Sequence, residues 1–192
     1  TYTATITSTT AETVTVTAAI GGTDVTNTAD VSFTATAATV GNSTLTASPT
    51  TVAADGSTTS TMTLQAKDAN GNNLSAGGLT VTMTESGSAT LSTVFDNTDG
   101  TYTATITSTT AETVTVTAAI GGTDVTNTAD VSFTATAATA GNSTLTASPT
   151  TVAADGSTTS TMTLQPKDAN GNDVNTGGLT VTMTTTGSAT LG

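Results

Sequence analysis

The sequence predicts an all-β protein built from tandem β-sandwiches, and three observations carry the prediction. Apolar and polar residues alternate in many short runs, which is the pattern of strands with one buried face. Thr, a β-branched residue that favours strands, fills most of the polar positions in these runs. The chain also repeats itself almost unchanged at an offset of 100 residues.

The internal repeat defines the organisation of the 192-residue chain. Residues 1–91 align with residues 101–191 without a gap and differ at only eight positions. Four of the eight differences fall at residues 73–76. Near-identity over this length indicates a recent duplication, and we expect the parent to be a longer tandem array of which this chain is a window.

Strand and turn signals follow one another closely along the repeat. The alternation predicts strands at residues 2–7, 13–20, 25–35, 44–47, 51–54, 61–67, 79–84 and 89–91. Gly21-Gly22 predicts a tight turn between two of them. Pro49 cannot donate to a β-ladder, so we expect an edge strand that switches partner there. Residues 100–120 hold two strand runs around a short polar break, which fits either a hairpin or a corner between two sheets.

The spacing of these strands places a complete domain at residues 41–140, with about seven strands in a sandwich. Residues 37–43 are small and polar and are predicted to be a flexible linker. Residues 1–40 are then the C-terminal half of one repeat, and residues 141–192 are the N-terminal half of another. Neither half can bury its apolar face alone, so we expect both to be completed by neighbouring copies or adjacent repeats. A unit at residues 1–91 is disfavoured, because so short a linker could not cross a domain from end to end.

Composition excludes several classes of function. The net charge is −12, with 14 acidic residues against two lysines, and this repels nucleic acids and anionic lipid. There is no Cys, hence no disulfide or thiolate metal site. No apolar run is long enough to insert into a membrane. The chain has no His, and its acids are spread singly over turns, so we expect no enzyme activity.

Three segments carry a resemblance to a known family. They are residues 43–72, which end in K-D-A-N-G-N, residues 77–84 with G-G-L-T-V-T-M-T, and residues 99–120, which begin D-G-T-Y-T-A. This series resembles the bacterial immunoglobulin-like repeats of intimin, invasin and related cell-surface adhesins. The resemblance covers essentially the whole chain. It implies immunoglobulin-like sandwiches outside the cell, on the bacterial surface, with any receptor bound by a terminal domain.

The acidic loop after residue 67 suggests a metal. Asp68 and Asn70 in one copy, and Asp168 and Asp173 in the other, are calcium candidates, since calcium prefers carboxylate and amide oxygens. The spacing does not fit an EF-hand, because the glycine is fourth and the twelfth residue is Leu79. Asn70-Gly71 is also the usual pair of a type I′ turn, which accounts for the motif without a metal.

We therefore expect a non-enzymatic structural repeat that forms the stalk or spacer of a bacterial surface adhesin. The alternative is a subunit of a self-assembling extracellular filament, in which half-domains are completed by strands from neighbouring copies. A glycan-binding or ice-binding module is a third reading. It is disfavoured because aromatic residues are only 3% of the chain and because strand propensity alone explains the Thr-rich faces.

Overall fold

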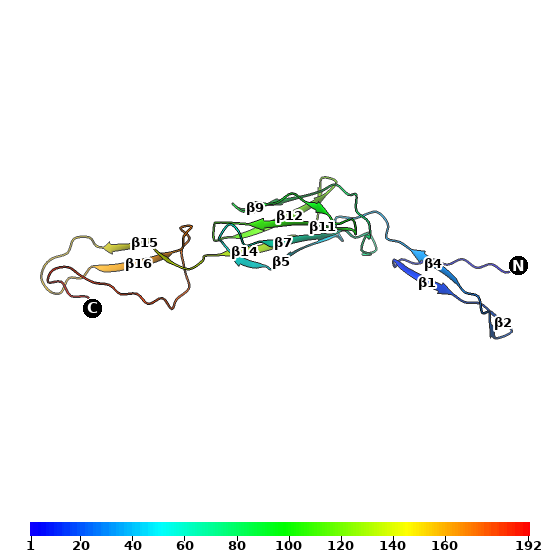
Figure 1. Ribbon diagram of the computed structural model, residues 1–192, viewed down its shortest axis with the longest axis horizontal. Helices are drawn as coiled ribbons and strands as arrows, with labels where there is room; N and C mark the ends of the chain where they lie inside the picture. Colours follow the sequence, from blue (N-terminus) through cyan, green and yellow to red (C-terminus); the bar gives the residue numbers. More distant parts are fainter. The chain divides into compact units, whose positions relative to one another are not determined.

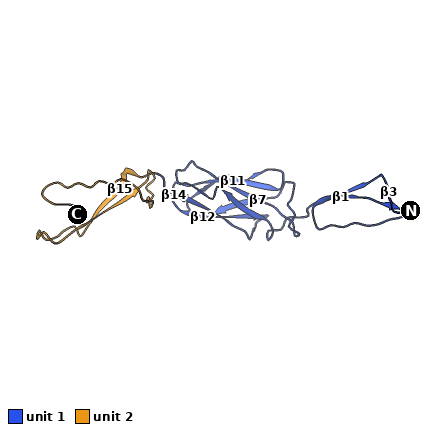
Figure 2. Cartoon of the chain, turned by 90° about the horizontal axis from the view of Figure 1, so that it is seen from below, with its two compact units in different colours: residues 1–136 blue, residues 137–192 orange.

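The computed structural model describes residues 1–192 and confirms the all-β prediction, with sixteen strands and no helix. Accordingly, it has no helix long and apolar enough to span a membrane. The chain divides into two units, residues 1–136 and residues 137–192 (Figure 2). The first unit contains a complete sandwich and, before it, a smaller set of strands.

The sandwich has two sheets (Figure 1). The strands of the first sheet are β5 (Thr44–Ser48), β7 (Ser60–Gln65), β9 (Thr90–Leu91), β10 (Phe95–Asp96) and β11 (Thr101–Thr107). Their order is β10-β11-β7-β5, and β9 also pairs with β11. All these pairings are antiparallel.

The second sheet faces the first across the core. Its strands are β6 (Thr51–Ala53), β8 (Val81–Glu85), β12 (Thr113–Ile120), β13 (Thr123–Asp124) and β14 (Ala129–Thr134). Their order is β13-β12-β14-β6, and β8 also pairs with β12. The β6–β14 pairing is parallel, and the others are antiparallel.

Three connections between strands can be compared with the predictions made from the sequence. Pro49 lies between β5 and β6, which belong to different sheets, so the predicted change of partner is confirmed. Strands β11 and β12 also lie in different sheets, so residues 100–120 form a corner and not a hairpin. The predicted Gly21-Gly22 turn is confirmed as well, with φ of 60° and 83° between two paired strands.

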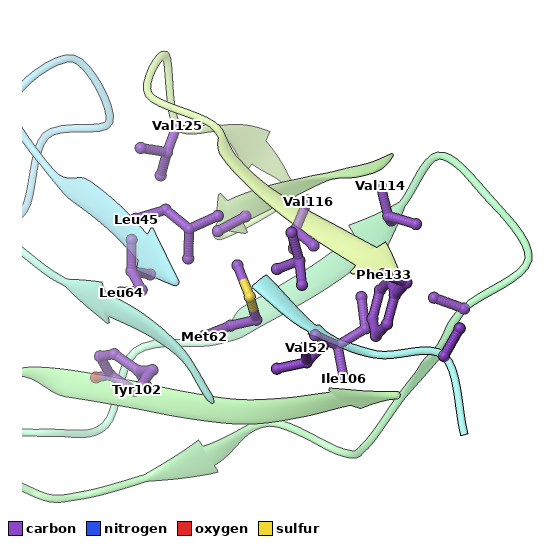
Figure 3. Packing of buried hydrophobic residues seen from close by; sticks show 14 of the residues in the cluster. Leu45, Val52, Met62, Leu64, Tyr102, Ile106, Val114, Val116, Val125 and Phe133 are labelled. Atoms are coloured by element: carbon purple, nitrogen blue, oxygen red, sulfur yellow. The ribbon is translucent and has the colours of Figure 1, made fainter. Parts of the chain in front are cut away.

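The core is made of small and medium side chains, as the composition requires. Alternate residues of β7, β11, β12 and β14 point inward, and Met62, Ile106 and Val116 are fully buried (Figure 3). The other buried members are Leu45, Val52, Ala54, Leu64, Ala66, Ala89, Tyr102, Val114, Ala118, Val125, Val131 and Phe133. Thr residues occupy most of the intervening outward positions. The two-residue alternation of the sequence therefore accounts for both the buried and the solvent-facing side of each sheet.

Residues 1–36 form far less structure than their copy at 101–136. Their strands are β1 (Glu12–Val16), β2 (Ala19–Ile20), β3 (Thr23–Asp24) and β4 (Ala29–Phe33). Strand β1 pairs only with β4, and β2 only with β3. The strand predicted at residues 2–7 is absent, because its copy β11 is held between β7 and β10 and no such partners are present here.

The second unit contains one antiparallel pair, β15 (Thr139–Ser148) and β16 (Thr161–Lys167). Residues 151–154 and 179–184 form no strands, although their copies form β6 and most of β8. In the complete domain those two strands pair with β14 and β12, and residues 151–154 and 179–184 have no such pairing in the second unit. Identical sequences therefore adopt different structures according to the partners at hand.

A close backbone contact lies where β11 begins. Gly100 has a φ of 85°, and a Cβ on it would collide with the carbonyl group of Leu74. Its own carbonyl accepts the Ala66 N–H at 3.0 Å. Two residues later, the buried Tyr102 hydroxyl accepts the Leu79 N–H at 3.0 Å. At position 100, therefore, only glycine can adopt the positive φ and fit beside the Leu74 carbonyl.

We predict that Gly100→Ala destabilises the sandwich by at least about 2 kcal/mol, because it adds both backbone strain and a clash. Gly41→Ala is the matched control, since Gly41 has no positive φ and no atom within 4 Å of the position that an added methyl group would take. The control should change stability by less than about 1 kcal/mol. Urea unfolding of the full chain measures both, and equal effects would contradict the prediction.

Candidate functional site: the junction between repeats

The loop after β7, residues 68–72, is organised by its first residue. The Asp68 N–H donates to the Asn72 carbonyl at 3.0 Å, and the Gly71 N–H donates to the Asp68 carbonyl at 3.0 Å. Asp68 Oδ1 accepts the N–H groups of Asn70 and Asn72, both at 2.9 Å. Gly71 has a positive φ of 84° but Asn70 does not, so the predicted type I′ turn is wrong. The glycine is instead the last residue of a four-residue turn that begins at Asp68.

The other carboxylate oxygen of Asp68 binds the preceding segment of chain. Asp68 Oδ2 accepts the Thr36 N–H at 3.0 Å and the Thr36 hydroxyl at 3.3 Å. It also accepts the Asn72 side-chain amide at 3.0 Å. Asp68 is 1% exposed. Hydrogen bonds, first from the Asn72 side chain and then from the Thr36 N–H, hold the pKa of the Asp68 carboxyl well below its usual 3.8.

Asn72 extends the same contact to a second point on the preceding repeat. Its amide Nδ2 donates to the Thr9 carbonyl at 2.9 Å. Its Oδ1 accepts the Ala11 N–H at 2.9 Å. Thr9 and Ala11 lie just before β1, whereas Thr36 lies just after β4. One five-residue loop therefore holds both the entry and the exit of the β1–β4 pair.

Residues 37–43 are not the flexible linker that their composition suggests. Ala38 forms a β-bridge with Asp68, and the Thr39 N–H donates to the Lys67 carbonyl at 2.7 Å. The buried Ser43 hydroxyl donates to the Thr39 carbonyl at 2.8 Å and accepts the Lys67 N–H at 3.0 Å. Most of these hydrogen bonds join main-chain groups, which every residue type carries, so the sequence alone does not predict them. The segment is docked along the end of β7.

The calcium candidates occupy two loops of the same design. Asp168 is buried and accepts the N–H groups of Asn170 and Asn172, as Asp68 does in its own loop. Asp173 does not join it, because Asp173 forms an ion pair with Lys167 at 2.5 Å. No group of three or more acidic side chains is gathered in the chain. Calcium at Asp68 would compete with N–H donors already bound to the carboxylate, and calcium binding stays a prediction.

Sequence reasoning missed the residues that matter most at this junction, namely Thr9, Ala11, Thr36 and Asn72. One signal could have found Asn72. Residues 68–72 are identical in the two copies, whereas residues 73–76 all differ. A loop that binds a neighbour at one end and faces solvent at the other would show this contrast.

The comparisons with known proteins agree with the fold. The family model of invasin domain 3 matches residues 39–136 and again residues 139–192. The two matches cover most of the chain, and the chain belongs to the invasin domain 3 family of bacterial immunoglobulin-like domains. The division of this chain at residues 40/41 and 140/141 stays a prediction.

Solved structures supply more particular relatives. The chain is 34% identical to invasin, a bacterial integrin-binding protein, with a TM-score of 0.62, and the match covers 84% of this chain and 33% of invasin. It is 30% identical to the Escherichia coli adhesin FdeC, with a TM-score of 0.54, over 85% of this chain and 52% of FdeC. InvD of Yersinia pseudotuberculosis has the same fold at 20% identity, with a TM-score of 0.55, over 86% of this chain and 52% of InvD. No curated protein sequence matches the chain.

The chain thus spans between a third and about half of these relatives. It is an adhesin-related domain array. The relatives are bacterial adhesins, and the part of them that it matches consists of immunoglobulin-like domains.

We predict that Asn72→Ala loosens the junction. The variant loses two hydrogen bonds to the preceding repeat, worth about 1–2 kcal/mol together, or a factor of about 5–30 in the ratio of docked to undocked junctions. Spin labels at Ala29→Cys and Thr61→Cys report the distance across the junction, and the chain has no other Cys. The distance distribution should broaden in Asn72→Ala. It should stay narrow in Asn70→Ala, because Asn70 contributes a backbone N–H. Equal widths in both variants would refute the assignment.

The depressed pKa of Asp68 predicts an acid-sensitive junction. Its folded pKa lies below its usual value of 3.8, so its stabilising contribution is complete above that value. The contribution is lost as pH falls below about 4 toward the folded pKa. Asp55, Asp99 and Asp155 are shifted in the same direction, so the wild type alone is not diagnostic. The difference in unfolding free energy between wild type and Asp68→Asn should be constant from pH 7 to 5 and shrink below pH 4. A difference that does not depend on pH would exclude this role of the carboxylate.

Proposed function

We propose that this chain is a non-enzymatic spacer in the extended stalk of a bacterial cell-surface adhesin. The observation that carries the proposal is the junction, where a single loop binds both ends of the preceding strand pair through Asp68 and Asn72. A linker held in this way limits the bending of one repeat against the next. Limited bending is what a stalk requires to hold a terminal domain away from the cell.

Two further observations support the spacer role. The repeat is nearly identical in its two copies. Adding further copies of one such unit lengthens a stalk and reuses the same contact between neighbouring repeats. The charge of −12 keeps neighbouring stalks apart and favours solubility.

The spacer role predicts how length depends on the number of repeats. Proteins with one to four copies of residues 41–140 in series should show a maximum dimension, by small-angle X-ray scattering, that grows linearly with copy number. A freely jointed series grows roughly as the square root of its length. Asn72→Ala in every repeat should move the growth toward the square-root law, and Asn70→Ala should not. Square-root growth in the unmodified series would refute the proposal.

A receptor-binding role is the competing possibility, because invasin is an integrin-binding protein. Fluorescently labelled chain should show no saturable binding to cells that carry integrins, since the spacer role needs none. Saturable binding that unlabelled chain displaces would assign recognition to these repeats.

A further inference from the structure

Asn70 is followed by a glycine in the loop that holds the preceding repeat. The main-chain nitrogen after an asparagine can attack the side-chain amide carbon, and glycine favours this reaction because it has no Cβ to obstruct the approach. Asparagine is accordingly counted among the thermolabile residues. The only other Asn-Gly pair in the chain is Asn170-Gly171, in the second copy of the loop.

The side chain of Asn70 is open to this attack, whereas other side chains that precede glycines are held. Asn70 is exposed, and it takes part in the loop through its backbone N–H, which donates to Asp68. Asp55 and Asp99 also precede glycines, but each carboxylate accepts the N–H group two residues further on. An ionised carboxylate is also a poor target for a nucleophile. Asn70 is therefore the reactive side chain of this kind in the central domain.

The attacking nitrogen is occupied while the loop is docked. The Gly71 N–H donates to the Asp68 carbonyl at 3.0 Å, and attack requires this nitrogen to lose its proton and to turn toward the Asn70 side chain. The N–H groups of Asn70 and Asn72 are held by the Asp68 carboxylate at the same time. The loop must therefore open locally before the reaction can begin.

We propose that Asn70 is a deamidation site that the docked junction protects and the undocked junction exposes. The Gly71 nitrogen forms a bond to Asn70 Cγ, and the side-chain nitrogen leaves as ammonia. Water then opens the resulting succinimide ring at either carbonyl, which gives aspartate or isoaspartate. The net change is the hydrolysis of one amide, so water is the only other reactant. The inference goes beyond the spacer role and concerns the chemical fate of the loop.

The isoaspartate product cannot rebuild the junction. Its main chain runs through Cβ and Cγ, so one additional backbone carbon lies between Asp68 and Asn72. In the intact loop, the Asp68 N–H donates to the Asn72 carbonyl at 3.0 Å, and the Asn72 N–H donates to Asp68 Oδ1 at 2.9 Å. A longer chain between the two residues breaks this reciprocal pair. The Asn72 side chain then loses its bonds to Thr9 and Ala11, and a transient opening of the junction becomes permanent.

Peptide mapping after incubation in warm, mildly alkaline buffer measures the reaction at both loops. Trypsin cleaves after Lys67 and Lys167, which places Asn70 and Asn170 in separate peptides. In the Asn72→Ala variant, Asn70 should react about 5–30-fold faster than in the wild type, the factor by which the two lost hydrogen bonds favour undocking. Asn170 in the same molecules should react at its wild-type rate.

Denatured chains give the reference rate for each protein. In urea no junction protects the loop, so the ratio of the native rate to the rate in urea removes any direct effect of the substitution on reactivity. For Asn70 in the wild type this ratio should be below about 0.1, because only the opened loop reacts. Asn72→Ala should raise the ratio toward one. Equal ratios in the two proteins, or a wild-type ratio near one, would overturn the proposal.

The effect of isoaspartate on the junction has its own measurement. The chain with Ala29→Cys and Thr61→Cys is incubated in urea, where the reaction is fastest, and is then refolded and spin-labelled. Its distance distribution should broaden in step with the isoaspartate content at Asn70. The control also carries Asn70→Gln, because glutamine forms the corresponding ring far more slowly and retains the backbone N–H that donates to Asp68. The control should stay narrow, and equal widths after the same treatment would show that isoaspartate does not open the junction.

Discussion

The apolar face of each half-domain is covered only by the other half, and the rest of the structure follows from this constraint. The core contains few large side chains, so no strand pair can bury enough surface by itself. Tyr102 and Met62 are buried because the β7–β11 ladder brings the halves together. The same sequence without its partner, at residues 1–8, forms no strand. Local propensity is thus permissive, and tertiary pairing decides the structure.

The junction between repeats also depends on groups that only a neighbouring segment can satisfy. A carboxylate is an unusual group to bury without a cation, yet Asp68 meets only N–H and O–H donors. These donors include orphan backbone groups at a turn and at the end of a linker, where no ladder reaches them. A carboxylate accepts several bonds at once, which an amide in its place could not do. The hydrogen bonds that Asp68 accepts therefore explain why an acidic residue begins this loop.

Much of the fold could be predicted from the sequence, and the reasons for success and failure are distinct. Alternation identified the inward positions of β7 and β12, such as Met62 and Val116, because a period of two directly records burial. The change of sheet at Pro49 followed from the missing N–H. The candidate site was only partly predictable. Asp68 was singled out as a metal ligand, but its partner Thr36 acts through a backbone N–H, which every residue except proline possesses.

The docking of residues 37–43 was missed for the same reason. Small polar residues are typical of a flexible linker, but here their main-chain groups pair with the end of β7. Composition indicates the preferences of the side chains, but it does not indicate which backbone N–H and C=O groups form hydrogen bonds.

The parallel pairing of β6 with β14 has a consequence for a domain pulled from its two ends. Strand β6 lies near the start of the domain and β14 at its end, and they are joined by backbone bonds from Ser132 to Thr50 and from Ala54 to Thr134, both 2.8 Å. Tension along the chain draws these two strands in opposite directions, parallel to their length. The bonds then share the load at the same moment and cannot be opened one after another, as they would be in a hairpin peeled from its end. This short ladder is a shear clamp between the beginning and the end of the domain.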